Sequence, residues 1–203
     1  MIKVTENFQL YLKATESAAI AAAKLRGNGD GKAADKVATE AMRKVLQDSE
    51  VHTRVVIGEG ERDDAPMLYI GEEMGNPQSD LKIDIAVDPL ECTNHCAKDL
   101  PDALSVLAAA PRGALLHAPD TYMDKLCGSS KLIGHIALDN SVEDNLSMAA
   151  KVLQKNTSDL KIIVMDRNRH VDLISKMKDL GVQPILIGDG DVSGGLKAAE
   201  GSV

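Results

Sequence analysis

Two acidic segments contain the residues whose types and spacing are best suited to chemistry. In the first, the mainly apolar run 83–87 ends at Asp88, and Pro89, Glu91 and Thr93 follow. Proline favours the first position of a helix, so the sequence predicts Asp88 as an N-cap and Glu91 at the third helical position. Two carboxylates and a hydroxyl would then lie beside a helix N-terminus. Carboxylates bind divalent cations and helix N-termini favour phosphate, so the pattern indicates metal-assisted phosphate chemistry.

The same residues have a plainer interpretation. Asp-Pro-x-Glu is also an ordinary helix start, in which Asp88 caps the helix and Glu91 completes a capping box without any ligand. Both interpretations fit this segment when it is considered alone.

The second acidic segment favours a metal site. Four carboxylates lie within the six residues 59–64, directly after a short β-branched run at 54–57. Like charges packed this closely repel one another unless a cation neutralises them, although a solvated acidic loop is the alternative. A further carboxylate, Asp35, lies near the start of a predicted helix behind the glycine-rich segment 27–31. Together these carboxylates predict a metal site.

Composition narrows the class of protein. The chain has 203 residues and a net charge of −8, which argues against nucleic-acid binding because that requires a basic surface. No apolar run approaches the roughly 18 residues that a membrane span needs, and the N-terminal residues show no targeting segment. Three cysteines without metal-ligand spacing indicate reduced thiols. We therefore expect a cytoplasmic protein that binds neither nucleic acid nor membranes.

The elements that must position these residues follow from periodicity and turn signals. Helices are expected at 6–26, 32–47 and 64–74. Strands are expected at 54–57, 83–87 and 103–110, and a second apolar run follows at 114–116. The region 80–137 therefore looks strand-rich.

From Ser141 onward the pattern changes to alternating helices and strands. Helices are expected at 141–154 (with Ser141 as its cap) and 171–180, strands at 161–165 and 184–187, and a last helical stretch after 188–191. This alternation predicts an α/β protein with lobes at 1–139 and 140–203. Two strands and three helices are few for an independent layer. The second lobe is therefore expected to be incomplete.

Several longer strings then resemble one family in order along nearly the whole chain. They are GEGERDDAPMLYIGEEMG (58–75), DIAVDPLECTN (84–94), APDTYMDKL (118–126), DRNRH (166–170) and GDGD (188–191). These strings are similar to class II fructose-1,6-bisphosphatase, some members of which also hydrolyse sedoheptulose 1,7-bisphosphate. The Asp-Pro-x-Glu-x-Thr element alone is shared with the wider superfamily of lithium-sensitive sugar and inositol phosphatases.

The resemblance implies a layered α/β sandwich that removes the 1-phosphate of a sugar bisphosphate with Mn²⁺ or Mg²⁺. Such an enzyme would act in gluconeogenesis or the Calvin cycle, as a homo-oligomer. Lobe 1–139 would bind metal and phosphate, and lobe 140–203 would bind the sugar. The matching positions are Asp35 and Glu59 for one metal, Asp88 and Glu91 for the other, Asp63 for water activation and Thr93 beside the scissile phosphate. The residues that match the family's substrate-binding positions are Glu91, Cys92, Thr93, Tyr122, Arg167, Asn168, Arg169, Asp189, Gly190 and Asp191.

Three departures from the family pattern bear on activity. Cys92 replaces a glycine in the phosphate-binding turn, where a side chain would be strained at positive φ and would crowd the substrate. Asn168 and Gly188 each replace a proline. A Gly-Gly-Ala-Pro-Glu-Gly stretch, whose glutamate supplies another metal ligand in the family, has no counterpart in this sequence.

Two alternatives to a sugar bisphosphatase remain at this point. One is a truncated, non-catalytic paralogue that acts, if at all, by associating with a full-length relative. The other keeps the chemistry but acts on an inositol phosphate or a nucleotide 3′-phosphate. The long strings at 58–75 and 118–126 argue against this second alternative.

Overall fold

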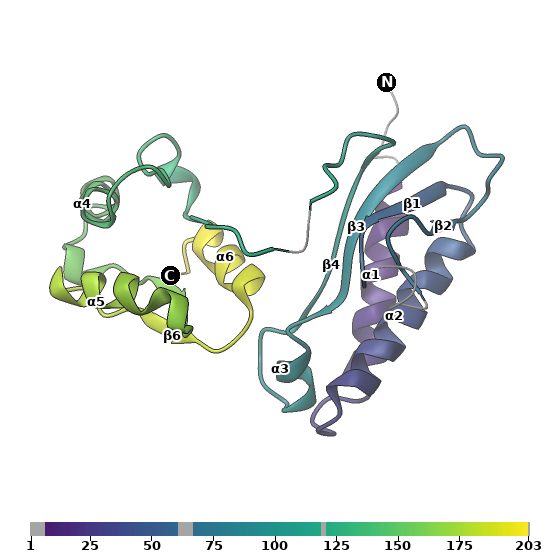
Figure 1. Cartoon of the computed structure of the whole chain (residues 1–203), viewed down its shortest axis with the longest axis horizontal. Coiled ribbons are helices and arrows are strands. Elements are labelled where there is room, and N and C mark those ends of the chain that lie inside the picture. Colours follow the sequence, from purple (N-terminus) through teal and green to yellow (C-terminus); the bar gives the residue numbers. More distant parts are fainter. Residues whose placement is uncertain (1–6, 61–66, 119–120, 203) are drawn as a thin grey trace. The chain divides into compact units, whose positions relative to one another are not determined.

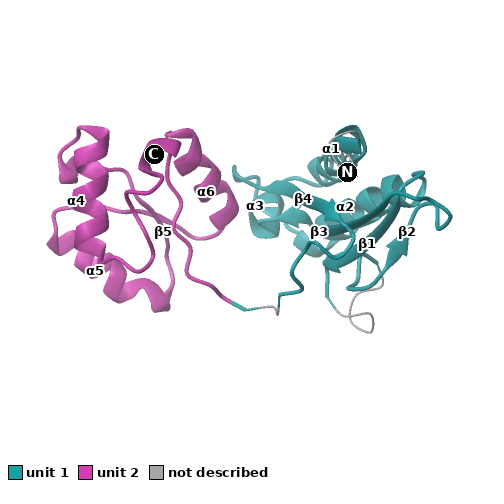
Figure 2. Cartoon of the chain, turned by 90° about the horizontal axis from the view of Figure 1, so that it is seen from above, with its two compact units in different colours: residues 1–121 teal, residues 122–203 magenta. Residues whose placement is uncertain are grey.

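The chain folds into two compact units, residues 1–121 and 122–203 (Figure 2). A computed structural model describes residues 7–60, 67–118 and 121–202. The division comes earlier than the expected boundary at 139 because the segment 122–139 packs with the second unit. Leu132 belongs to the core of that unit, and Ile136 packs against it.

The first unit contains helices and a mixed sheet. The helices are α1 (Phe8–Ala23), α2 (Gly31–Gln47) and α3 (Thr93–Ala97). Strands β1 (His52–Ile57), β2 (Glu73–Met74), β3 (Lys82–Glu91) and β4 (Leu104–Pro111) form a sheet in the order β2-β1-β3-β4. Strand β3 is parallel to β1 and antiparallel to β4. The apolar run 114–116 does not form a strand.

Helices α1 and α2 pack on each other and on one face of the sheet (Figure 1). Small residues recur at helical spacing on the surfaces that meet, and Ala14, Ala18, Ala34 and Ala38 are all fully buried. Alanine side chains at such positions let the two helix backbones approach closely. Helix α2 begins after Asp30, whose side chain accepts a hydrogen bond from the backbone N–H of Ala33. The helix that carries Asp35 therefore has a fixed start.

Side chains of β3 alternate between the helix-covered face and the opposite face. Ile83 and Ile85 are buried in the core with the helices, whereas Asp84 pairs with Arg54 and Arg112. Arg54 donates from Nε and Nη2 to the two carboxylate oxygens of Asp84, at 3.0 and 2.9 Å. Burial alone would raise the pKa of Asp84, but hydrogen bonds and the two arginine charges lower it. The pair holds β1 and β3 together on the face away from the helices.

The predicted helix start at Asp88 is wrong. Strand β3 continues through Glu91, because both Asp88 and Glu91 pair with β4, and the helix α3 begins only after Cys92. Pro89 lies where the register between β3 and β4 shifts, a position at which a strand tolerates the missing N–H of proline. Asp88 and Glu91 are therefore strand residues and not the cap and third residue of a helix.

The helix expected at 64–74 is also not formed in the part that is described. Residues 67–72 form turns that lead into β2, and Leu68 has φ of +52°. The carboxylate of Glu72 accepts a hydrogen bond from the backbone N–H of Leu68 and another from Arg43 Nε at 2.7 Å. These bonds tie the segment to α2 and replace the helical hydrogen bonds that local sequence had suggested.

The second unit has the expected alternation of helices and strands. Its long helices are α4 (Val142–Leu153), α5 (Val171–Asp179) and α6 (Asp191–Glu200), and its strands are β5 (Ile163–Met165) and β6 (Ile185–Ile187). Short 3₁₀ turns occur at η2 (Ser130–Leu132), η3 (Thr157–Asp159) and η4 (Asn168–His170). Strands β5 and β6 are parallel neighbours.

The predicted cap of α4 is confirmed. Ser141 Oγ accepts a hydrogen bond from the backbone N–H of Asp144 at 3.0 Å and donates to the Asp144 carboxylate at 2.6 Å. The core of the unit is built mainly from aliphatic side chains of these helices and of β5, including Leu146, Val164 and Ile174. Among the described residues, no helix combines the length and apolar character needed to cross a membrane.

Candidate functional site

The glycine-rich segment 27–31 brings α2 against α3. A Cβ atom on Gly31 would lie 3.0 Å from Thr93 Cγ2, so the start of α2 packs closely on the first residue of α3. The backbone N–H of Gly29 also donates to the carbonyl of Ala97 at 2.9 Å. These contacts fix the beginning of the helix that carries Asp35 beside the end of β3. The glycines are thus needed for close approach rather than only for a turn.

Glu59 is positioned by a close crossing of two backbone segments after β1. A Cβ atom on Gly58 would lie only 2.0 Å from the carbonyl oxygen of Leu68, so no larger residue fits there. The N–H of Glu59 donates to that same carbonyl at 3.0 Å, and the N–H of Ile70 donates to the carbonyl of Gly60 at 2.9 Å. This crossing anchors the backbone of Glu59 at the end of β1.

Asp88 and Thr93 are held by local hydrogen bonds at the end of β3. Asp88 Oδ1 accepts from the backbone N–H of Leu90 at 3.0 Å, and Thr93 Oγ1 donates to the carbonyl of Leu90 at 2.9 Å. Glu91 pairs with Leu104 at the last position of the β3–β4 ladder. The remaining candidate in this unit, Asp63, lies outside the described residues.

Three of these carboxylates affect one another electrostatically. Burial raises the pKa of Glu59 to about 7, and the negative charges of Asp35 and Asp88 add to the shift. Burial also raises the pKa of Asp35, with a further contribution from Asp88. Like charges are thus gathered from α2, from the end of β1 and from β3.

The described carboxylates do not form a complete metal-binding group. Across residues 7–60, 67–118 and 121–202, no three His, Cys, Asp or Glu side chains are placed so that they could hold one ion together. Their oxygen chemistry and their mutual repulsion nevertheless fit a hard divalent cation, since such a cation would relieve the repulsion.

The backbone of Cys92 has a left-handed conformation, which glycine adopts more readily than other residues. Its φ is +69° and its ψ is +45°, which is the left-handed region, and its side chain is buried. A non-glycine residue there carries strain of about 1–2 kcal/mol. The condition under which a side chain would be strained in this turn, a positive φ, is thus met, and the strain lies between Glu91 and Thr93.

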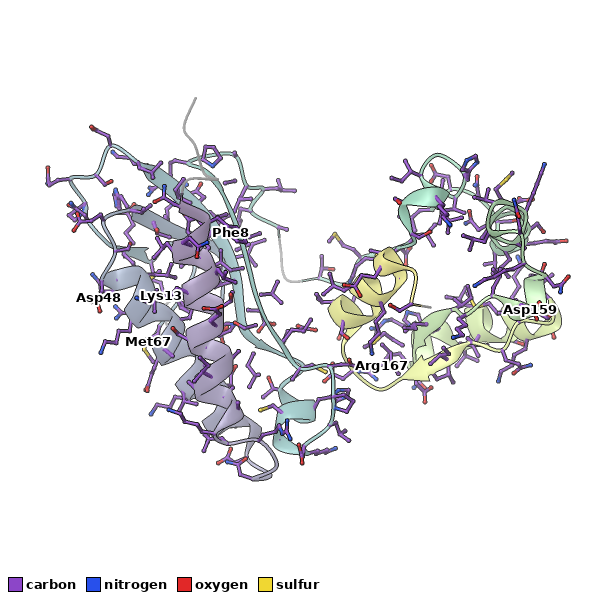
Figure 3. The ribbon with its side chains drawn as sticks, turned by 180° about the vertical axis from the view of Figure 1, so that it is seen from behind. Phe8, Lys13, Asp48, Met67, Asp159 and Arg167 are labelled. Carbon is purple, nitrogen blue, oxygen red and sulfur yellow. The ribbon has the colours of Figure 1, made fainter. Side chains whose placement is uncertain are left out.

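The candidates of the second unit gather after the two parallel strands. Arg167 (labelled in Figure 3), Asn168 and Arg169 follow β5, and Arg169 stacks its guanidinium on the ring of Tyr122 at 4.1 Å from the ring centre. Arg167 directs Nη1 to the carbonyl of Asp166 at 3.0 Å. Ligands of open parallel sheets commonly bind at the carboxyl ends of strands, where these residues lie.

The other candidates follow β6. Asp189 Oδ1 accepts the backbone N–H of Gly190 at 3.0 Å, Gly190 has φ of +88°, and Asp191 is the first residue of α6. Asp191 also forms an ion pair with Lys125, with Nζ 3.0 Å from Oδ2. Lys125 was not among the residues that sequence reasoning selected. Its only sequence signal is its place in the string 118–126, close after Tyr122.

Comparison with known proteins identifies the family. The family described as bacterial fructose-1,6-bisphosphatase, glpX-encoded, matches residues 6–202. The chain belongs to this family. It is 48% identical over 198 residues to the D-fructose 1,6-bisphosphatase class 2/sedoheptulose 1,7-bisphosphatase of Synechococcus sp. (strain JA-3-3Ab), covering 92% of this chain and 57% of the relative.

Other relatives in this fructose-1,6-bisphosphatase family match the chain over a similar length and at similar identity. The proteins of the same name from Thermosynechococcus vestitus and Synechocystis sp. are each 44% identical over 199 residues, which is 93% of this chain. The alignments cover 57% and 58% of those relatives, so the chain spans little more than half of their length. The resemblance inferred from the strings in the sequence is confirmed.

Proposed function

We propose that this chain is a metal-dependent phosphatase that removes the 1-phosphate of fructose 1,6-bisphosphate. Sedoheptulose 1,7-bisphosphate is the second proposed substrate, because the relatives are named for both activities. The observation that carries the proposal is that α2, the end of β1 and β3 bring Asp35, Glu59 and Asp88 into one region, where burial and then the charges of Asp35 and Asp88 raise the pKa of Glu59. Family membership favours this function over a non-catalytic paralogue.

Asp35, Glu59, Asp88 and Glu91 would hold Mn²⁺ or Mg²⁺ through their carboxylate oxygens. A bound divalent cation polarises the phosphoryl group and lowers the pKa of a bound water. Close contacts at Gly58 and Gly31 anchor the backbones beside Glu59 and at the start of the helix that carries Asp35. Ordered backbones with adjustable side chains are suited to such a site.

The chain's own residues would orient the phosphate and the sugar. Thr93, whose hydroxyl now bonds the carbonyl of Leu90, would lie beside the scissile phosphate with the turn at Cys92. Asp63 is proposed to take a proton from the attacking water.

In the second unit, cations and acceptors have separate tasks. Two arginines would bind the distal phosphate, since guanidinium groups form paired hydrogen bonds with phosphate oxygens. Carboxylates would accept hydrogen bonds from sugar hydroxyls, and the neighbouring polar groups would exchange hydrogen bonds with them. The proposed residues are Tyr122, Arg167, Asn168, Arg169, Asp189, Gly190 and Asp191.

Further features of the assembly are proposed on the same basis. We propose a layered sandwich in which the second unit is incomplete, supported by the 42% exposure of both Ile185 and Leu186 in β6. Homo-oligomerisation is proposed from the family. A cytoplasmic location is proposed because Cys92, Cys96 and Cys127 are free thiols.

Phosphate release from fructose 1,6-bisphosphate tests the proposed function. We expect release with Mn²⁺ or Mg²⁺, none with chelator, and a loss of at least about 100-fold in Asp88→Ala, because a cation ligand is removed. An inositol monophosphate and a nucleoside 3′-phosphate serve as competing substrates. Release from one of these in preference to the sugar bisphosphate, or no release from a folded chain, would contradict the proposal.

A further inference from the structure

A short segment, residues 122–127, makes two polar contacts across the carboxyl ends of β5 and β6. The guanidinium of Arg169 lies over the ring of Tyr122, with Cζ 4.1 Å from the ring centre. Lys125 Nζ lies 3.0 Å from Asp191 Oδ2. The segment has no regular secondary structure and its residues are exposed, and Cys127 at its end lies beside Gly195 of α6.

The two partners of this segment, Arg169 in η4 and Asp191 in α6, follow the ends of neighbouring strands. Met165 and Ile187 are paired at the ends of parallel β5 and β6. Arg169 follows Met165 by the same number of residues as Asp191 follows Ile187. Because neighbouring strands are only about 4.8 Å apart, the segment reaches both strand ends within a short length of chain.

Asp191 has a fixed backbone but an adjustable side chain. It begins α6 directly after Gly190, whose left-handed conformation sets the direction of the helix. Its side chain is 41% exposed, and that of Lys125 is 56% exposed. An ion pair with this exposure contributes little to stability, typically below about 1 kcal/mol. The contact therefore matters for where the carboxylate lies rather than for how stable the fold is.

We propose that Lys125 is a positioning residue for the sugar-phosphate ligand, acting by holding the Asp191 carboxylate at the ends of β5 and β6. In this position the carboxylate can accept hydrogen bonds from sugar hydroxyls without first losing side-chain freedom. The inference rests on the proposed function, because Asp191 is assigned there to the sugar. In this proposal Lys125 acts through its ion pair with Asp191 and makes no contact with the ligand.

Calorimetric titration of the purified chain with fructose 6-phosphate tests this assignment. We expect Lys125→Met to weaken binding by about fivefold and Lys125→Arg to stay within about twofold of the wild type. The unfolding midpoint should not change in either variant, since the pair is exposed. Lys131→Met, which removes another exposed lysine of the same unit, serves as the matched control and should bind normally.

A double-mutant cycle separates positioning from direct contact with the ligand. If Lys125 acts through Asp191, Lys125→Met should have no further effect in the Asp191→Asn background. Equal binding by Lys125→Met and wild type, or additive effects of the two changes, would overturn the assignment. A folded wild-type chain that binds no fructose 6-phosphate would overturn the proposed sugar site and this inference together.

Discussion

Glu59→Gln is expected to stabilise the metal-free chain at pH 8 by about 2 kcal/mol, measured by urea unfolding in chelator. Burial and the charges of Asp35 and Asp88 raise the pKa of Glu59 to about 7, so its ionisation above that pH opposes folding. A raised carboxyl pKa makes stability highest below the ordinary glutamate value and lowers it as pH rises through about 7. The glutamine side chain has no acidic proton and stays neutral at pH 8.

The pH dependence provides the control for this prediction. At pH 4, where Glu59 is protonated in both states, the variant and the wild type should differ by less than about 0.5 kcal/mol. Glu16→Gln, an exposed glutamate of α1, should behave like the wild type at both values. A variant that is no more stable than the wild type at pH 8 would mean that burial and the neighbouring carboxylates do not oppose the ionisation of Glu59 as the structure indicates.

Cys92→Gly is expected to raise kcat/KM for fructose 1,6-bisphosphate by about tenfold, because glycine removes both the strain and the side chain from the turn that we propose to bind phosphate. Cys92 has φ of +69°, where a Cβ atom is unfavourable. Stability should change by less than about 1 kcal/mol, since the relief of strain is offset by the greater chain entropy of glycine and the loss of a buried sulfur.

Cys92→Ala separates the two contributions of the cysteine. Alanine keeps the Cβ atom at positive φ but removes the sulfur. An increase with glycine that alanine does not share would assign the effect to the Cβ atom and the backbone, and equal increases would assign it to the sulfur. Turnover that stays flat or falls in the glycine variant would contradict the proposal that Cys92 crowds a phosphate-binding turn.

Local signals in the sequence were sufficient where local hydrogen bonds decide the structure. Ser141 and Asp144 form the expected cap because both partners lie in one helical turn. The helix start at Asp88 was wrong because pairing with β4, a distant segment, extends β3 through Glu91. No local pattern carries that information.

Positions of the site residues depend on contacts that one segment alone cannot reveal. The helix expected at 64–74 is replaced by turns because Glu72 bonds Arg43 of α2 and the N–H of Leu68. Similarly, the glycine at 58 could be read as a turn signal, but not as a position where two backbones cross. The resemblance supplied the candidate residues, whereas the structure supplied their neighbours, including Lys125.

Manganese binding to the purified chain, measured by isothermal titration calorimetry, tests the central claim that the first-unit carboxylates form a cation site. We predict saturable binding to the wild type, weakened at least about tenfold in Asp88→Asn and unchanged in Asp48→Asn, an exposed aspartate at the end of α2 (Figure 3). Equal binding by the wild type and Asp88→Asn, or no binding by the folded wild-type chain, would contradict the claim.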